Sequence, residues 1–246
     1  STICKFRKAA IQKALFLKPK SSTMSNSLLK GKRGIIFGAL DPNSIAWKVA
    51  VRAHEEGAQF TLTNAPVALR MGAINQLAEQ CNAKVIGADA TSNADLEALF
   101  TQSMEALGGK IDFVLHSIGM SPNVRKNKPY TDLDYDYYHK TIDISAMSLH
   151  RVLQSAMKVD AISEWGSVVA LTYIAAQRVF PDYNDMADAK SMLESIARSY
   201  GYHYGKSKKV RVNTISQSPT KTTAGQGVKG FDGFFNYADA ISPLGN

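Results

Sequence analysis

The chain has 246 residues, 45% of them hydrophobic and 20% charged, which suits one α/β domain or at most two small ones. No uninterrupted apolar stretch approaches the roughly 18–20 residues that a membrane-spanning helix needs, which excludes an integral membrane protein. The cysteines, Cys4 and Cys81, are too few for a disulfide framework or a paired-cysteine zinc cluster, and they fit a reducing compartment such as the cytoplasm. The five histidines show no metal-ligand spacing, so we expect no bound metal.

The net charge of +8 arises mainly at the start of the chain. Six basic residues and no acidic one precede Met24, namely Lys5, Arg7, Lys8, Lys13, Lys18 and Lys20. Taking these six from the 29 basic residues leaves 23 against 21 acidic ones, so we expect no nucleic-acid-binding face. Residues 1–23 have the composition of a transit peptide, but sequence upstream of a start at Met24, or a disordered tail, is the favoured interpretation. We therefore place the folded domain at residues 24–246.

Two kinds of segment alternate from Lys32 onward. Short apolar runs predict buried strands at residues 34–37, 59–63, 84–87, 112–116, 167–171 and 210–215. Longer segments with helical spacing lie at residues 44–56, 67–80, 93–107, 134–157 and 183–204. This order predicts an α/β fold, a Rossmann-type doubly wound parallel sheet with helices on both faces and ligands at the carboxyl ends of the strands.

The turn after the first predicted strand is a candidate dinucleotide site. Gly38 allows the backbone to approach a pyrophosphate, and a helix starting at Ser44 and Ile45 offers free N–H groups and a partial positive charge. The usual G-x-G-x-x-G pattern is absent, and a plain turn between strand and helix is an equal alternative.

Other strand ends add candidates for the same ligand. The third strand is followed by Asp89 and Ala90, where an acid could bind an adenine amino group, and the fourth by Ser117, Ile118 and Gly119, which leave room for a flat ring. The second strand ends without the carboxylate that favours NAD over NADP, and Arg70 lies nearby. These residues leave the choice between NADH and NADPH open.

A tyrosine and a lysine are the candidate catalytic groups. Tyr183 and Lys190 are seven residues apart, which predicts one shared helix face with about 10 Å between them along the axis, and Asp182 is the predicted N-cap. Tyr173 follows the fifth predicted strand. A neutral phenol can donate to an oxygen that gains charge on hydride transfer, and a nearby ammonium favours that charge. The alternative is an aromatic residue against the sheet and a solvated lysine.

The sequence resembles the short-chain dehydrogenase/reductase superfamily, and within it the bacterial enoyl-acyl carrier protein reductases. The superfamily pattern is Tyr-x-x-x-Lys, but Ala187 stands where that lysine belongs, and Tyr-x6-Lys with a tyrosine ten residues earlier is the reductase pattern. The resemblance runs from about Leu28 to the last residue. It also includes the His-Ser-Ile-Gly motif at 116–119, Asp-Ile-Ser at 143–145 and the segment 210–216.

The resemblance implies a reductase of fatty-acid biosynthesis that transfers a hydride from NADH to the β-carbon of a trans-2-enoyl thioester. The implied catalytic residues are Tyr173, Tyr183 and Lys190. Tyr183 would donate to the enolate oxygen, Lys190 would bind the nicotinamide ribose, and Tyr173 would line the substrate pocket and support the thioester end. The cofactor-contacting positions would be Gly38, Ser44, Ile45, Asp89, Ala90, Ser117, Ile118, Gly119, Lys190, Thr220 and Thr222. Residues from about 220 to 237 would form a mobile loop over the acyl chain.

The resemblance also implies partners. These are an acyl carrier protein and a homotetramer, without nucleic acid or membrane. Since relatives continue with another helix and a final strand, we expect the sheet to stop before its last strand. Residues 125–128, Arg-Lys-Asn-Lys, could meet an acidic carrier protein or form a solvated loop. Alternative functions are a ketone or alcohol oxidoreductase, disfavoured by Ala187, and a non-catalytic dinucleotide-binding protein.

Overall fold

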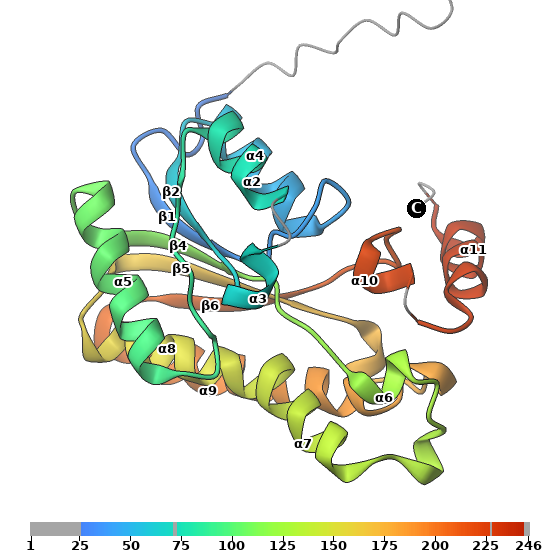
Figure 1. Ribbon diagram of the computed structural model, residues 1–246. Helices are drawn as coiled ribbons and strands as arrows, with labels where there is room; N and C mark the ends of the chain where they lie inside the picture. Colours follow the sequence, from blue (N-terminus) through green and yellow to red (C-terminus); the bar gives the residue numbers. More distant parts are fainter. Residues whose placement is uncertain (1–25, 71–72, 227, 244–246) are drawn as a thin grey trace, which may run out of the picture.

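A computed structural model describes residues 26–70, 73–226 and 228–243. It confirms the doubly wound fold, with one six-stranded parallel sheet in the order β3-β2-β1-β4-β5-β6 (Figure 1). The strands are β1 (Arg33–Phe37), β2 (Gln59–Thr63), β3 (Lys84–Val85), β4 (Ile111–His116), β5 (Ile162–Thr172) and β6 (Arg211–Ser216). The basic segment 1–23 lies outside the described residues.

Helices cover both faces of the sheet. Figure 1 shows α2 (Ile45–Glu55) and α4 (Ala73–Cys81) on one side, and α5 (Asn93–Leu107), α8 (Ser148–Lys158) and α9 (Asp185–Lys208) on the other. Strand β1 shows how both faces of the sheet are buried. Ile35 and Phe37 face the core under α5, α8 and α9, whereas Ile36 faces the core under α2 and α4, and all three are almost fully buried.

Two predicted helices are interrupted. The segment 67–80 forms α3 (Pro66–Leu69) and α4, and the segment 134–157 forms α7 (Tyr135–Ile142), a π-helix (Asp143–Met147) and α8. The extra residue per turn in the π-helix places Ser145 so that its hydroxyl bonds both the backbone N–H and C=O of Met120, at 2.9 and 3.0 Å. Hydrophobic spacing alone does not reveal such a local change of helix type.

The remaining elements follow the ends of the strands. They are α6 (Pro122–Arg125), α10 (Thr223–Gln226), α11 (Phe231–Ile241) and three 3-10 helices (Tyr130–Asp132, Ile174–Ala176 and Pro181–Tyr183). In Figure 1, α6, α10 and α11 lie beyond the carboxyl ends of the strands. Within the described residues β6 is an edge of the sheet, and Ile215 on it is 52% exposed. No described helix is long and apolar enough to cross a bilayer.

Candidate active site

The strand order reverses between β1 and β4, and the segments that follow these two strands approach each other closely. Gly38 has φ +90°, and a Cβ on it would lie 1.9 Å from the carbonyl oxygen of Ser117. Only glycine fits, because any side chain would meet backbone rather than a movable group. In doubly wound sheets this switch point is the ligand-binding crevice.

The start of α2 completes the turn. The hydroxyl of Ser44 donates to the carbonyl of Asp41 at 2.7 Å and accepts from the N–H of Leu40 at 3.2 Å. It therefore shapes the turn instead of capping the helix, and α2, which begins at Ile45, has no side-chain cap. Uncapped N–H groups beside a glycine that only a backbone can approach fit the pyrophosphate of a dinucleotide.

Two tyrosines meet at the end of β5. The rings of Tyr173 and Tyr183 lie 5.0 Å apart between centroids, tilted by 54°. Burial raises the pKa of both phenols. The rise is larger for Tyr183, and the neighbouring Tyr173 raises its pKa further. Both phenols are therefore protonated and available as hydrogen-bond donors at neutral pH.

Lys190 reaches the same place from α9. Its side chain is only 7% exposed, and its Nζ donates to the carbonyl of Leu171, two residues before Tyr173, at 2.8 Å. A Cβ on Gly119 would lie 3.8 Å from Nζ, so the segment after β4 faces the ammonium. Burial lowers the pKa of Lys190 to about 8, which leaves the amine largely charged at pH 7.

A buried histidine lies behind this lysine. His116 is fully buried, its Nε2 is 2.9 Å from the hydroxyl of Ser148, and its Nδ1 has no partner among the described residues. Burial, with the charge of Lys190 as a second cause, lowers the pKa of His116 to about 3. The imidazole is therefore neutral at physiological pH, so Lys190 carries the positive charge of this pair.

The predicted helix-face geometry of the tyrosine–lysine pair is wrong. Tyr183 ends a 3-10 helix (Pro181–Tyr183), Asn184 has φ 46° and ψ −135°, and α9 begins only at Asp185. Asp182 is therefore not the N-cap. Both side chains still reach the end of β5, Tyr183 through its ring contact with Tyr173 and Lys190 through its hydrogen bond to the Leu171 carbonyl.

The other predicted cofactor positions lie around the same edge of the sheet. Asp89 and Ala90 follow β3, and the Asp89 carboxylate accepts from the N–H and hydroxyl of Thr91. Thr220 is exposed, whereas Thr222 is buried and its hydroxyl accepts from the N–H of Gly225 at 2.9 Å. A hydrogen bond of 2.6 Å from Thr223 to Asp41 joins α10 to the first turn.

The segment 220–237 forms α10 and most of α11, where a loop was expected. Its Phe234 ring lies 5.4 Å from Phe180, which lies 5.2 Å from Tyr173. With Tyr183, these rings form a continuous aromatic line from the phenols to α11. An apolar chain extending from the site would find contacts along this line.

Asp185 is not among the candidate residues that the sequence predicts. The side chain is fully buried and accepts hydrogen bonds from Ser121, Asn123 and Thr141. No local signal marks it, because its partners are 44 to 64 residues away in the sequence.

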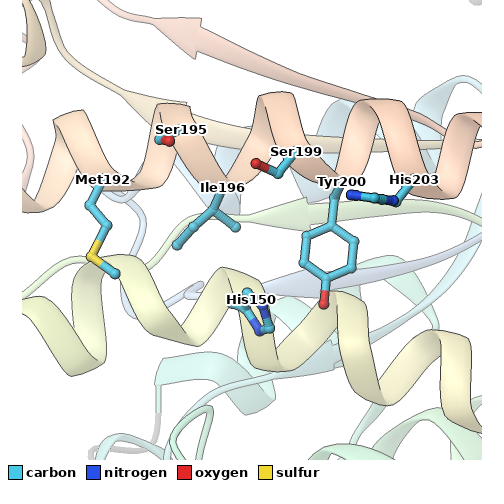
Figure 2. Close-up of a pocket in the computed structure, with 7 residues that line it drawn as sticks. All are labelled: His150, Met192, Ser195, Ile196, Ser199, Tyr200 and His203. Carbon is cyan, nitrogen blue, oxygen red and sulfur yellow. The ribbon is translucent and has the colours of Figure 1, made fainter.

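A separate cavity of about 510 Å³ lies between α8 and α9. Figure 2 shows His150 on one helix facing side chains of the other. The lining residues are His150, Met192, Ser195, Ile196, Ser199, Tyr200 and His203. None of them belongs to the tyrosine–lysine site.

The fold, the glycine turn and the tyrosine–lysine pair together define a dinucleotide-binding reductase of the short-chain dehydrogenase/reductase type. A family model described as enoyl-(acyl carrier protein) reductase matches residues 38–246. The chain belongs to this family, whose predicted resemblance is thereby confirmed.

Named relatives and solved structures agree. Enoyl-[acyl-carrier-protein] reductase [NADH] 1 of Rhizobium meliloti is 36% identical over 221 residues, covering 89% of this chain and 79% of the relative. The FabI of Rickettsia bellii is 32% identical, covering 90% and 83%. A FabI–NADH complex from Alistipes finegoldii has a TM-score of 0.88 and 64% identity, covering 89% and 78%. The reductase of Aquifex aeolicus has a TM-score of 0.80 and 30% identity, covering 89% and 84%.

Proposed function

We propose that this chain is an NADH-dependent enoyl-acyl carrier protein reductase that saturates the double bond of a trans-2-enoyl thioester in fatty-acid biosynthesis. The observation that carries the proposal is that Tyr183 and the buried Lys190 both reach the end of β5, where Gly119 faces the ammonium. The relatives named above are enoyl-acyl carrier protein reductases, and all four carry NADH in their names or titles.

The residues at the switch point would hold the cofactor. The turn at Gly38 and the start of α2 suit the pyrophosphate, Asp89 the adenine end, and Lys190 the nicotinamide ribose. When bound, NADH supplies a hydride to the β-carbon of the enoyl group. The smallness of Gly119 keeps the ring position in front of Lys190 open, because even a methyl group there would contact Nζ.

The phenol of Tyr183 would stabilise the charge that develops on the thioester oxygen. Its raised pKa keeps it protonated, so it can donate a hydrogen bond to that oxygen throughout turnover. The Lys190 ammonium adds a positive charge to the same site, out of water, where its electrostatic effect is strongest. Tyr173 packs on Tyr183 and lines the substrate side.

NADH is the proposed cofactor rather than NADPH, chiefly because relatives are named for it. At the end of β2, the side-chain amide of Asn64 donates a hydrogen bond to the carbonyl of Ala39 at 3.0 Å. Arg70 is exposed nearby and could meet a 2′-phosphate. Comparing the affinities for the two cofactors by fluorescence titration decides between them.

The acyl carrier protein is the proposed substrate carrier. Arg125 and Lys126 are exposed, and the carbonyl of Lys128 accepts from Asn184, which places this basic segment next to the catalytic tyrosine. Reversing the charges of Arg125 and Lys128 should raise the KM for carrier-bound substrate and spare a coenzyme-A analogue. Equal effects on both substrates would refute this docking site.

We further propose that residues 24–246 form one reductase domain, that it works in the cytoplasm, and that it assembles into a homotetramer. The cavity between α8 and α9 (Figure 2) marks the surface that we propose for self-association. Analytical ultracentrifugation gives the mass of the assembly, and a monomer at micromolar concentration would contradict the tetramer.

One assay separates the candidate functions. NADH and NADPH absorbance are followed with a crotonyl thioester and, in parallel, an acetoacetyl thioester. Turnover of the crotonyl substrate supports the proposal, and turnover of the acetoacetyl substrate alone supports a ketone reductase. Cofactor binding without turnover of either substrate indicates a non-catalytic dinucleotide-binding protein.

A further inference from the structure

The catalytic tyrosine lies just before a strained residue. Asn184 has φ 46° and ψ −135°, a region that side-chain-bearing residues avoid at a cost of about 1–3 kcal/mol. Such a conformation persists only where its surroundings hold it. Asn184 is buried, and its amide donates to the carbonyl of Lys128. The position of Tyr183 therefore depends on what fixes this junction, because Tyr183 is outside the helix that carries Lys190.

The residue on the other side of the junction is held more firmly. One oxygen of the Asp185 carboxyl group accepts from the hydroxyl of Ser121 at 2.6 Å. The other accepts from the amide of Asn123 at 2.8 Å and from the hydroxyl of Thr141 at 2.9 Å. The side chain is completely buried, and none of these donors is charged. A buried carboxyl group is costly unless its oxygens are bonded in this way.

The three donors come from elements that shape the site. Ser121 also accepts from the N–H of Val124 at 3.0 Å and so begins α6, which directly follows the segment 117–119. Asn123 also bonds the backbone N–H and C=O of Asp134 at 3.1 and 3.0 Å, and Thr141 belongs to α7. One carboxyl group thus joins the first turn of α9 to α7 and to the segment after β4.

We propose that Asp185 is a positioning residue for the reduction: through Ser121, Asn123 and Thr141 it fixes the spacing between Tyr183, the segment 117–119 and Lys190. The inference rests on the proposed function for its kinetic consequence, but the mechanical link can be tested without substrate or cofactor.

A neighbouring carboxylate offers a matched control. Asp188, one turn further along α9, accepts from the hydroxyls of Tyr130 and Tyr138, each at 3.1 Å. It also joins α9 to the α7 region, but it is partly exposed and has no hydrogen bond to α6 among the described residues. Replacing Asp188 removes a comparable tie between elements and leaves the junction next to Tyr183 untouched.

Hydrogen–deuterium exchange on the protein without cofactor tests the link directly. Asp185→Ala should speed amide exchange both at 184–190 and at 120–124, because it releases Ser121 and Asn123, whereas Asp188→Ala should leave 120–124 at the wild-type rate. Unchanged exchange at 120–124 in Asp185→Ala would overturn the proposal.

Kinetics tests the consequence. In the wild type, turnover should fall as pH rises through the Lys190 pKa of about 8. Asp185→Ala should lower kcat by ten- to a hundredfold, as expected for a displacement of about 1 Å. It should also shift the basic limb of the pH profile, because displacing the start of α9 changes the burial that sets the Lys190 pKa. A smaller folded fraction would scale the profile without moving it, and that result would overturn the proposal.

Two milder variants cover the case in which Asp185→Ala does not fold. Thr141→Val removes, at constant shape, the hydroxyl's bond to Asp185 together with its bond to the carbonyl of Tyr137 in the same helix. Asp185→Asn keeps two acceptor bonds through its amide oxygen. Thr141→Val should lower kcat and shift the pH limb in the same direction, and Asp185→Asn should restore most of the activity lost in Asp185→Ala. Wild-type behaviour of Thr141→Val would refute the inference. A wild-type protein that turns over no enoyl thioester would instead refute the proposed function.

Discussion

Substituting alanine for Gly38 tests the geometry of the cofactor turn, with Gly108→Ala as its control. Both glycines have positive φ, +90° and +71°. A Cβ at Gly38 would lie 1.9 Å from the carbonyl oxygen of Ser117, whereas a Cβ at Gly108 would meet nothing within 4 Å. Both variants should lose about 1–2 kcal/mol from backbone strain. Gly38→Ala should lose about 1–3 kcal/mol more, because a methyl group is forced into a packed contact with backbone.

The difference between the two variants isolates the clash. It is measured as the difference in free energy of unfolding by urea titration, and as a difference in Tm of roughly 2–4 °C for each kcal/mol. Gly38→Ala should also lose NADH binding, measured by fluorescence, because the ends of β1 and β4 must separate. Gly108→Ala should bind NADH like the wild type. Equal unfolding free energies and equal NADH affinities would refute the close approach at the switch point.

Three further predictions concern the buried groups. Tyr183→Phe should reduce kcat much more than NADH affinity, whereas Lys190→Ala should reduce both. Stopped-flow kinetics measures the turnover, and fluorescence titration measures the affinity. A wild-type rate for Tyr183→Phe would remove the phenol from the mechanism. Burial lowers the Lys190 pKa to about 8 in the folded state, so charging the amine opposes folding. Lys190→Met should therefore be more stable than the wild type at pH 7, by on the order of 3 kcal/mol in free energy of unfolding. This difference should shrink as pH rises from about 8 towards 10.5. A constant difference across that range would contradict the buried charge. The folded-state pKa of His116, about 3, lies below its ordinary value of 6.5, so its contribution to stability is present above pH 6.5 and is lost as pH falls towards 3. His116→Gln should lose less stability over that range in urea titrations, and parallel curves would show that the imidazole does not govern it.

The sequence by itself determined the layers of this fold. Short apolar runs separated by segments with helical spacing leave a parallel sheet as the arrangement that buries both faces, and β2 and α5 have the predicted bounds. Strand ends were predictable for the same reason, which is why Gly38, Ser117 and Gly119 were found as candidates before their contacts were known. The Tyr-x6-Lys spacing identified the family because it is a pattern along the chain.

Tertiary structure alone decided how the proposed catalytic groups are held. Tyr183 lies outside α9, although its spacing from Lys190 predicted a shared helix, because the Asn184 junction is fixed by the Lys128 carbonyl 56 residues away. The role proposed for Asp185 depends on its hydrogen bond from Ser121, 64 residues earlier. Periodicity reports which side of an element is apolar, but it carries no information about polar contacts between segments that meet only after folding.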